Sequence, residues 1–513
     1  MVDLAPRRSM VDKDHMHYID LAWQPDSGSP TPFFRQLAHY VRNQIRSGVL
    51  PPGTRLPPQR LLADQLGVNR STIVAAYDEL QADGLLLGQR GGGTVVCVAE
   101  GINDAVFDWQ DVLDRGAFVP DRSLAAEVAS ARVLPDTISL AQGELATALR
   151  PTAALQDLFH EAPVSEEWLG YEGMYGYAPL RETIAAHMTA RGATTEPENV
   201  LSLAGAQQGL YLICRGLLQA GDTVVVEAPS YLLTLGVLQM AGIRVLRAPL
   251  DYFGLIPDRL EELLARHRVS MVFTVPAYQN PTGAVLAASR RSALLELCER
   301  YRVPLIEDDV YGELGFAGAP PVPLYARDPG GYVIHVSSIS KSVAPGLRAG
   351  WLIGQPRLIK RLAEMQYQMH YGNSTVSQWV TTQWLRGSRH GTHLDQTRKK
   401  LLARSTVLAD ELRRQFGGLL TFAQPQGGFH LWARVNAPIS STSLFRRALR
   451  AGIGLKPGSL YGVPAHHCWI RLSFQHATLA ELHAAPATLR AVVDALIQEG
   501  SDAEDCTSQS AAM

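Results

Sequence analysis

The sequence contains few cysteines and few charged residues, and each scarcity narrows the class of protein. Five of its 513 residues are cysteine, and they stand far apart along the chain. An odd and scattered set is typical of reduced thiols, not of a disulfide framework or a zinc site. Charged residues make up 19% and hydrophobic residues 46%. This composition is that of ordinary globular proteins, and the length allows two or more domains.

Long apolar runs are also missing. No run reaches the length of a membrane span, and the first residues lack the basic and apolar regions of a signal peptide. We therefore expect a cytoplasmic protein with no membrane partner. The net charge of −2 gives the chain as a whole no attraction to nucleic acid.

The charge is distributed unevenly along the chain. Residues 32–98 hold seven arginines and four acidic residues, a net charge of +3. A locally basic segment favours contact with a polyanion such as DNA. Three other segments lack a regular pattern. We expect a flexible arm at residues 1–31, an acidic linker at 99–135 with helical turns near 109–113 and 124–131, and a disordered tail at 500–513.

Short apolar runs alternate with longer helical segments in residues 136–499. Such alternation predicts an α/β fold with a mostly parallel sheet wrapped by helices. The predicted strands are 200–203, 223–226, 244–248, 271–274, 304–307, 333–336 and 349–353.

The basic segment has the pattern of three helices followed by a β-hairpin. Apolar residues recur at helical spacing over 34–47, 60–66 and from 69 or 70 to about 84. A tight turn at Gly67-Val68-Asn69 separates the second and third helices, as in a helix-turn-helix. Residues 85–87 and 94–98 flank a glycine-rich tip, which predicts a wing.

This segment resembles the GntR-type winged helix over nearly its whole length. The matching motifs are Gly48-Val49-Leu50, Pro52-Gly53, Leu56-Pro57, Arg60, Leu62-Ala63, Leu66-Gly67-Val68, Arg70-Ser71-Thr72, Ala76-Tyr77, Leu80, Gly84 and Gly93-Thr94. The resemblance implies that a double-stranded operator contacts Arg60, Asn69, Arg70, Ser71 and Thr72, and that Arg90 and Gly91 enter the minor groove. Pro58 departs from the family, which usually has a serine that contacts phosphate there.

Chemistry supports this placement of the DNA contacts. The amides and short polar side chains at a helix start bind phosphate, and Arg70 is long enough to reach a base edge. A structural alternative is that Asn69, Ser71 and Thr72 only cap the helix. The long ordered match favours the DNA contact.

A second set of motifs lies in the α/β body. The stretch Ser338-Ile339-Ser340-Lys341, followed by Pro345-Gly346-Leu347-Arg348, resembles the lysine segment of class I aminotransferases of fold type I. The turn Gly205-Ala206-Gln207, Asn280-Pro281-Thr282-Gly283 and Arg471 stand in the matching order. This resemblance implies pyridoxal 5′-phosphate (PLP) as cofactor and a smaller C-terminal α/β subdomain.

By the same resemblance, Lys341 is the catalytic residue and forms a Schiff base with PLP. Asp308 pairs with the pyridine nitrogen, Tyr311 and Asn280 bond the phenolic oxygen, and Tyr231 stacks on the ring. Arg471 binds an amino-acid carboxylate with its bidentate fork. The residues expected to hold the phosphate are Ala206, Gln207, Ser338, Ser340, Arg348 and, from the other subunit of a homodimer, Tyr171.

Each of these residues also has an ordinary structural reading. A single lysine after a serine is usually a surface residue, Asp308 can be a turn acid, and Arg471 can form a structural ion pair. Taken together and in order, the set favours PLP. The histidines at 390–393 and 466–467 complete no four-ligand set, so we expect no metal.

The whole chain resembles the MocR/GabR family of bacterial regulators. This resemblance implies a PLP-dependent, DNA-binding homodimer, cytoplasmic and nucleoid-associated when bound to DNA. Its effector is PLP itself or a small amine or amino acid, sensed through the Lys341 Schiff base. The alternative is an active aminotransferase with a DNA-binding head, because Asn280, Asp308, Tyr311, Lys341, Arg348 and Arg471 form a full set for transamination.

Overall fold

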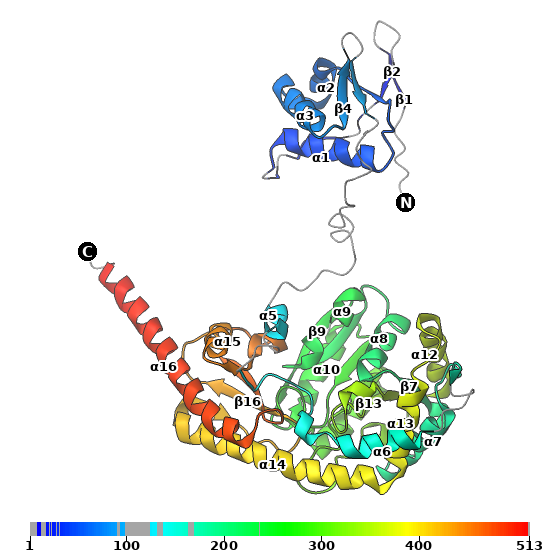
Figure 1. Cartoon of the computed structure of the whole chain (residues 1–513), viewed down its shortest axis with the longest axis vertical. Coiled ribbons are helices and arrows are strands. Elements are labelled where there is room, and N and C mark those ends of the chain that lie inside the picture. Colours follow the sequence, from blue (N-terminus) through cyan, green and yellow to red (C-terminus); the bar gives the residue numbers. More distant parts are fainter. Residues whose placement is uncertain are drawn as a thin grey trace. The chain divides into compact units, whose positions relative to one another are not determined.

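The computed structural model describes residues 8–11, 17–19, 21, 23–26, 28–29, 31–89, 93–97, 124–130, 137–162, 169–234 and 236–510. The chain divides into two units, Met1–Gly116 and Ala117–Met513, here called the head and the body (Figure 1). The division falls inside the segment 99–135 that was predicted to be a linker.

The head has the predicted three helices and hairpin. Its described helices are α1 (Phe33–Arg46), α2 (Gln59–Leu66) and α3 (Arg70–Ala82). Its antiparallel sheet has the order β3 (Arg55–Leu56), β5 (Gly93–Val96), β4 (Leu86–Gln89). Gly67 ends α2 with φ of 64°, a conformation that glycine adopts without strain, and so makes the turn into α3.

The position of α3 on α1 is held by a buried apolar face and by charges. Ile73 and Tyr77 of α3 are fully buried in the head core, and the Tyr77 hydroxyl donates to the Pro57 carbonyl at 2.9 Å. At the edge, Arg42 of α1 pairs with Glu79 at 3.2 Å and with Asp83 at 2.5 Å. The recognition helix is therefore a rigid part of the head.

The prediction of a flexible arm at residues 1–31 is wrong for its described part. Strands β1 (Arg8–Val11) and β2 (His17–Ile19) pair as an antiparallel hairpin. Leu21 is only 5% exposed in the head core, with Trp23 packed against it. Removal of these apolar surfaces from water favours a fixed position for the chain at Leu21 and Trp23, although the sequence there has no periodicity.

The large sheet of the body carries all seven predicted strands. In the described residues it has eight strands in the order β10-β9-β8-β11-β12-β13-β14-β7. The β9-β8-β11-β12-β13 run is parallel, whereas β14 is antiparallel to both neighbours. The bounds are β7 Val200–Leu203, β8 Thr223–Ala228, β9 Arg244–Asp251, β10 Gly254–Leu255, β11 Met271–Thr274, β12 Leu305–Asp308, β13 Val333–Ser338 and β14 Gly350–Ile353.

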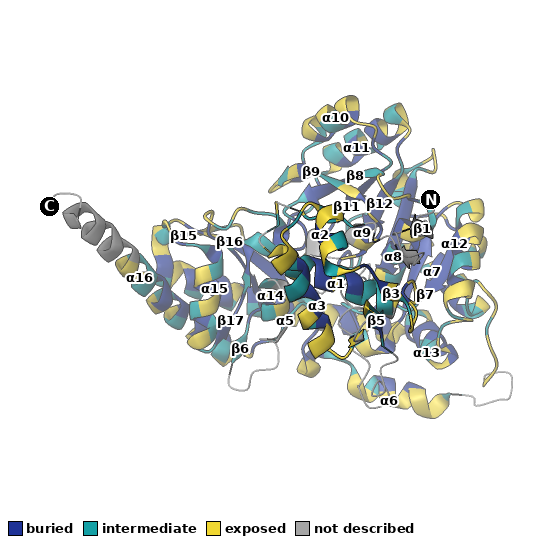
Figure 2. Ribbon diagram, turned by 90° about the horizontal axis from the view of Figure 1, so that it is seen from above, coloured by how far each residue is buried: buried dark blue, intermediate teal, exposed yellow. Residues whose placement is uncertain are grey.

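Helices cover both faces of this sheet (Figures 1 and 2). Neighbouring residues of a strand point to opposite faces, so Val224 packs toward α8 and α12 while Val225 packs toward α10 and α11. The α/β fold class is confirmed. The helices are α6 Thr152–Glu161, α7 Ala178–Ala190, α8 Ala206–Gly216, α9 Val237–Met240, α10 Pro257–Arg266, α11 Ala288–Tyr301, α12 Pro356–Met369 and α13 Thr375–Arg386.

The body ends in a smaller α/β subdomain. Its antiparallel sheet has the order β15-β16-β19-β18, and a parallel pair joins β17 to β6. The helix α14 begins beside the large sheet and ends against this subdomain (Figure 1). The elements are β6 Ile138–Ser139, α14 Ser388–Phe416, β15 Leu420–Phe422, β16 His430–Val435, α15 Ser441–Arg450, β17 Ile453–Gly454, β18 Lys456–Pro457, β19 Trp469–Ser473 and α16 Leu479–Ser510.

Two predicted irregular segments differ from the structure here. Helix α5 (Leu124–Ser130), expected as a helical turn of the linker, packs on the subdomain: Val128 is buried, and Glu127 pairs with Arg446 at 3.0 Å. Helix α16 continues to Ser510, so the prediction of a disordered tail is wrong for residues 500–510. Residues 511–513 lie outside the described residues, as do 109–113 of the linker. Among the described helices, none is both long and apolar enough to cross a bilayer.

Candidate functional site

The predicted cofactor residues meet at one edge of the large sheet. Asp308 is the last residue of β12, Ser338 is the last residue of β13, and Lys341 follows three residues later. Parallel strands end at the same edge, so the fold brings these distant residues together. This edge is where open α/β sheets bind ligands.

A cradle for a phosphate is formed at this edge. Ser338, Gly350 and Leu203 pair across β13, β14 and β7, and the turn at Gly205 then leads into α8. Gly205 has φ of 102°, and a Cβ there would lie 2.9 Å from Nη2 of Arg348. Only glycine therefore fits between the arginine and the first amides of α8, which is a typical anion-binding arrangement.

Apart from Tyr171, the remaining predicted phosphate residues lie on the same turns. Arg348 is held by the Ala204 carbonyl at 2.7 Å, so its guanidinium is fixed above the start of α8. Ser340 follows β13, and its amide donates to the Ser338 hydroxyl at 3.4 Å. Ala206 is half-buried and Gln207 is exposed at the first turn of the helix.

Asp308 is the most strongly constrained acid of the site. Its side chain is buried, with the residue 1% exposed, and burial raises its pKa to about 6 even though the Tyr231 hydroxyl and the Val310 amide donate to it. The nearby Lys341 ammonium lowers the pKa in the opposite sense. A positively charged ligand group beside this buried carboxylate would stabilise its ionised form. Tyr231 contacts this carboxylate, and its stacking role stays a prediction.

Asn280 and Arg471 form a connected pair. Nη1 of Arg471 donates to Oδ1 of Asn280 at 3.0 Å, and Nη2 donates to the Ala141 carbonyl. Arg471 is 2% exposed, and its guanidinium lies 5.6 Å from the ring centroid of Tyr461. Within the described residues, neither Nε of Arg471 nor the Tyr461 hydroxyl makes a hydrogen bond of good geometry. The Arg471 guanidinium also offsets part of the rise that burial causes in the pKa of Tyr461, and a buried guanidinium of this kind is suited to an anionic ligand.

Tyr311 is buried beside a histidine that the sequence did not single out. Its hydroxyl lies 3.2 Å from Nε2 of His430, and Nδ1 of His430 lies 3.0 Å from Oγ of Ser473. Burial, together with the positive charges of Arg471, Lys341 and Lys456, holds the pKa of His430 well below its ordinary value. His430 is therefore a neutral hydrogen-bonding group at neutral pH.

Lys341 is half-buried and points at a backbone carbonyl. Its Nζ donates to Gly143 at 2.6 Å. The segment 140–144 that contains Gly143 also accepts from Arg471 and from the amide of Ser473. Gln475 donates to the carbonyls of Gln142 and Glu144 in the same segment. Side chains of the site, together with Gln475, thus fix the position of residues 140–144 through hydrogen bonds to their carbonyls.

Sequence reasoning missed His430, Tyr461 and the 140–144 segment. The glycine pair at 427–428 before His430 is a signal of close backbone approach, and Cβ atoms at these two glycines would meet Tyr278 at 2.4 and 3.0 Å. The segment 140–144 carries no comparable signal.

The other predicted site residues lie on surfaces. Tyr171 is 85% exposed, with its ring 5.5 Å from that of Tyr371. In the head, Arg60, Asn69, Arg70 and Ser71 are exposed, and Thr72 is half-buried.

The start of α3 is open rather than capped. In the described head, no side-chain hydrogen bond of Asn69 caps α3, so the capping alternative does not account for this residue. Arg90 and Gly91 lie outside the described residues.

One of the histidines considered in the sequence, His390, lies in a cluster with two residues from elsewhere in the body. His390, His187 and Glu313 have ligand atoms within 4.8 Å of one another. The Trp384 indole N–H donates to Nδ1 of His390 at 3.0 Å, which leaves the imidazole proton on Nε2, facing Glu313 at 3.3 Å. That tautomer has no lone pair for a metal at Nε2, and the cluster joins α7 and α14 to the turn that contains Glu313.

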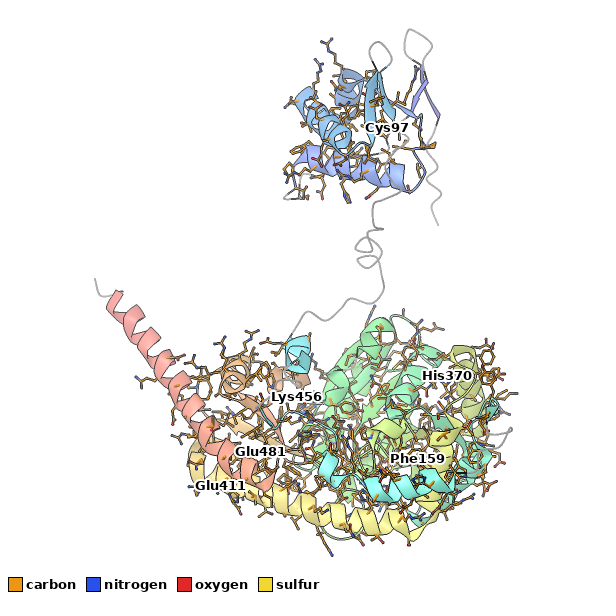
Figure 3. The ribbon with its side chains drawn as sticks, in the orientation of Figure 1. Cys97, Phe159, His370, Glu411, Lys456 and Glu481 are labelled. Atoms are coloured by element: carbon orange, nitrogen blue, oxygen red, sulfur yellow. The ribbon has the colours of Figure 1, made fainter. Side chains whose placement is uncertain are left out.

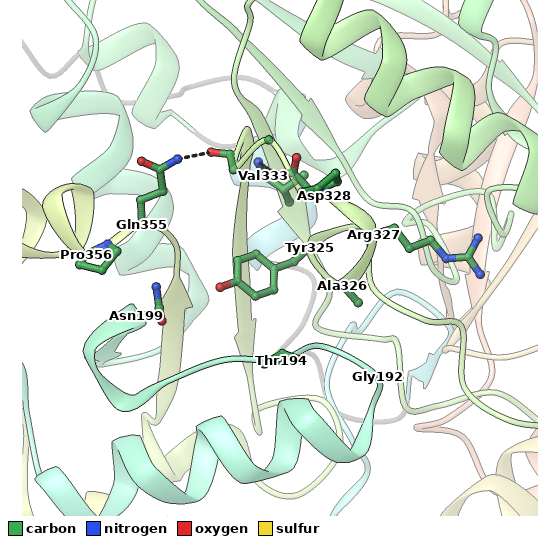
Figure 4. Close-up of a pocket in the computed structure, with 13 residues that line it drawn as sticks. Gly192, Thr194, Asn199, Tyr325, Ala326, Arg327, Asp328, Val333, Gln355 and Pro356 are labelled. Atoms are coloured by element: carbon green, nitrogen blue, oxygen red, sulfur yellow. Dashed lines mark hydrogen bonds between the residues drawn. The ribbon is translucent and has the colours of Figure 1, made fainter.

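A pocket of about 570 Å³ lies at the opposite end of β13 (Figure 4). Its lining includes Tyr325, Asp328 and Gln355, and none of the predicted site residues. Asp328 accepts the Val333 amide at 2.6 Å, and Gln355 donates to the Gly331 carbonyl at 3.2 Å. Both hydrogen bonds go to the loop that leads into β13, at residues 331–333.

The residues at the carboxyl edge fit PLP. The Gly205 cradle with Arg348 suits the phosphate, the buried Asp308 suits a protonated pyridine nitrogen, and Lys341 suits the aldehyde. Together with the head, these features define a protein in which an aminotransferase-type α/β body is joined to a winged helix-turn-helix.

Comparison with known proteins agrees with this class. Residues 34–96 match the gntR family of bacterial regulatory proteins, and residues 135–487 match aminotransferase class I and II. The chain belongs to the aminotransferase class I and II family, with the MocR/GabR-type architecture that the sequence predicted.

Three relatives illustrate the match. The chain is 35% identical to the uncharacterized HTH-type transcriptional regulator YdfD of Bacillus subtilis (strain 168), covering 88% of this chain and 94% of YdfD. Kynurenine aminotransferase of Pyrococcus horikoshii, solved with PMP, superimposes with a TM-score of 0.69 at 28% identity, over 77% of this chain and 98% of the enzyme. The α-aminoadipate aminotransferase LysN of Thermus thermophilus, complexed with N-(5′-phosphopyridoxyl)-L-leucine, gives 0.69 at 26% identity, over 76% and 100%. A family with such members implies PLP dependence.

The burial of Asp308 predicts a gain in stability when its charge is removed. Its folded-state pKa of about 6 lies above the unfolded value near 4, so ionisation destabilises the fold fully above pH 6 and progressively less as the pH falls toward 4. Asp308→Asn should therefore stabilise the cofactor-free protein by up to about 3 kcal/mol at pH 8 and by roughly half of that at pH 5. Urea denaturation of both proteins at pH 8 and pH 5 measures the difference in their free energies of unfolding. A variant less stable than the wild type at pH 8 would contradict the prediction.

Proposed function

We propose that this protein is a transcriptional regulator that binds operator DNA through α3 and PLP through Lys341. The observation that carries the proposal is the coexistence in one chain of an exposed, uncapped start of α3 and a body site in which Lys341 lowers the pKa of the buried Asp308 and Arg471 donates to Asn280. As proposed, it is a cytoplasmic bacterial protein, associated with the nucleoid when bound to DNA.

The pocket residues have distinct tasks toward PLP. Lys341 would hold the aldehyde, Asp308 the pyridine nitrogen, and Tyr311 with Asn280 the phenolic oxygen. Arg348, Ser338, Ser340 and the amides of Ala206 and Gln207 would bind the phosphate. When bound, PLP supplies an electron-withdrawing ring that stabilises negative charge on the α-carbon of an attached amine.

The effector is PLP itself, or an amine or amino acid that competes with the Lys341 amine. Arg471 would bind the carboxylate of an amino acid with its buried, planar guanidinium. A Lys341 side chain released in this way has an acceptor in reach at the Gly143 carbonyl.

The segment 140–144 gives the pocket a connection to the linker. It follows β6 and α5, the first described elements of the body after the linker, and three pocket residues donate to it: Lys341, Arg471 and Gln475. A change in the ligand state of Lys341 or Arg471 would alter these bonds. The body can therefore influence the chain that leads to the head without any unfolding.

A homodimer fits the exposed aromatic residues of the body. Tyr171, Tyr367 and Tyr371 are exposed and lie close together around α12. We propose that a second copy covers them, and that Tyr171 reaches the phosphate of the partner subunit. Two heads then require two half-sites on the operator.

The second candidate function is transamination. The contact of Asn280 with Arg471, and the burial of Asp308, preserve the groups that an aminotransferase uses. We expect slow turnover or none, because a regulator responds to an effector only while that effector stays bound. Incubation of the holo protein with an amino acid and a keto acid, followed by product analysis, measures this; rapid sustained turnover would make the enzyme the main function.

Arg70→Ala should weaken specific operator binding by about 1–3 kcal/mol, because Arg70 is the long donor at the exposed start of α3. Fluorescence anisotropy with operator and with scrambled DNA measures both affinities. Arg35→Ala, an exposed arginine on α1, is the matched control. Full specific affinity in the Arg70 variant would argue against this helix as the reader.

Lys341→Ala should remove the visible absorbance band of the bound cofactor and the response of DNA binding to effector. Lys360→Ala, an exposed lysine on α12, should keep both. Absorbance spectra of the reconstituted proteins, followed by DNA titrations with and without effector, make the comparison. An unchanged band in the Lys341 variant would refute the assignment.

A further inference from the structure

One face of the subdomain sheet points into the pocket. Residues opposite each other on antiparallel strands have side chains on the same face. Arg471 of β19 is opposite Trp432 of β16 on one side and opposite Lys456 of β18 on the other. The alternate residues Leu431, Ile470 and Leu472 are buried in the apolar core on the other face.

Lys456 is therefore the direct neighbour of the proposed carboxylate-binding arginine. Directly opposed residues have Cβ atoms about 5 Å apart. Lys456 is half-buried (it is labelled in Figure 3), and its charge contributes, after burial, Arg471 and Lys341, to the low pKa of His430. Strand register thus places Lys456 beside Arg471, and its charge is close enough to affect His430.

The proposed function assigns a task to each of the other cations here and none to Lys456. Lys341 holds the aldehyde, Arg348 the phosphate and Arg471 one carboxylate. The chain strongly prefers arginine, since six of its 47 basic residues are lysine. Two of those six stand at this site. A lysine is a flexible point charge that can follow a ligand group of variable position, whereas arginine imposes a planar fork.

The other side of Arg471 is aromatic. Trp432 stacks on Trp469 with ring centroids 5.3 Å apart and an angle of 13° between the planes, and its ring lies 5.7 Å from that of Tyr461. The two sides of the arginine thus differ in character, with stacked rings on one and a positive charge on the other. Within the subdomain sheet, the cation next to Arg471 therefore lies on one side only.

We propose that Lys456 selects an effector with a second anionic group, a dicarboxylic amino acid, with Arg471 binding one carboxylate and Lys456 the other. This inference rests on the proposed amino-acid effector and deepens it. Beside the buried Arg471, an unpaired second carboxylate is unfavourable, and the Lys456 ammonium offsets that cost.

The test uses the full-length protein loaded with PLP and pairs of amino acids that differ only in charge. L-Glutamate with L-glutamine, and L-aspartate with L-asparagine, are titrated while the visible absorbance band is followed. Wild-type protein should bind at least one acid about 10-fold or more tightly than its amide. Lys456→Met should abolish that preference and leave the affinity for the amide unchanged. Lys456→Arg should retain most of it.

Arg434 provides the matched control. It lies on β16 opposite Trp469, two residues beyond Trp432 and therefore on the same face of the sheet, and it is exposed. Arg434→Met should therefore keep the preference. If Lys456→Met instead loses affinity for acid and amide alike, the substitution has damaged the site in general, and the inference is overturned.

Failure of the inference and failure of the proposed function give different results. If wild-type protein binds acids and amides equally, Lys456 has no selective role, while an amino-acid effector and PLP at Lys341 both stand. If the band is present and depends on Lys341 but no amino acid shifts it, the amino-acid effector is wrong, and the inference fails with it.

Discussion

The buried carboxylate of Asp308 is the interaction on which the rest of the pocket depends. It is 1% exposed at the end of β12, and the donors that reach it, Tyr231 and the Val310 amide, do not prevent burial from raising its pKa to about 6. A fold chosen for stability alone would place a neutral residue there. Retaining the acid makes sense when a cationic ring nitrogen binds against it, because the ligand then supplies the missing charge.

Around this acid, the fold joins two structures of different kinds. Parallel strands bring the Gly205 cradle, Asp308 and Lys341 to one edge, whereas the antiparallel subdomain sheet brings Arg471, Lys456 and His430 from the other side. Between them runs the segment 140–144, bonded to Lys341 and Arg471. Side chains from both structures thus donate hydrogen bonds to the same short segment after β6. The head itself keeps α3 rigid through Tyr77 and Arg42, so it can respond as one piece.

Much of this could be predicted from the sequence, for a physical reason. The parallel strands are short apolar runs with clear ends, so residues placed just after them, such as Asp308 and Lys341, had a foreseeable position. His430, Lys456 and Tyr461 could not be foreseen in the same way. His430 and Lys456 come together through the register of strands distant in sequence, and Tyr461 lies in the short 3-10 helix after β18; no local pattern records either placement. The described part of the arm was predicted wrongly because Leu21 is buried in the head core, a tertiary effect without periodicity.

The measurement that tests the central claim most directly is the location of the cofactor's attachment. Full-length protein reconstituted with PLP is reduced with borohydride, digested and mapped by mass spectrometry, so that the amine that held the aldehyde carries a permanent tag. The account predicts the phosphopyridoxyl group on the peptide containing Lys341 and its absence from the peptide containing Lys456. A tag on Lys456 or on another lysine, or no tag in a protein that binds PLP, would contradict it.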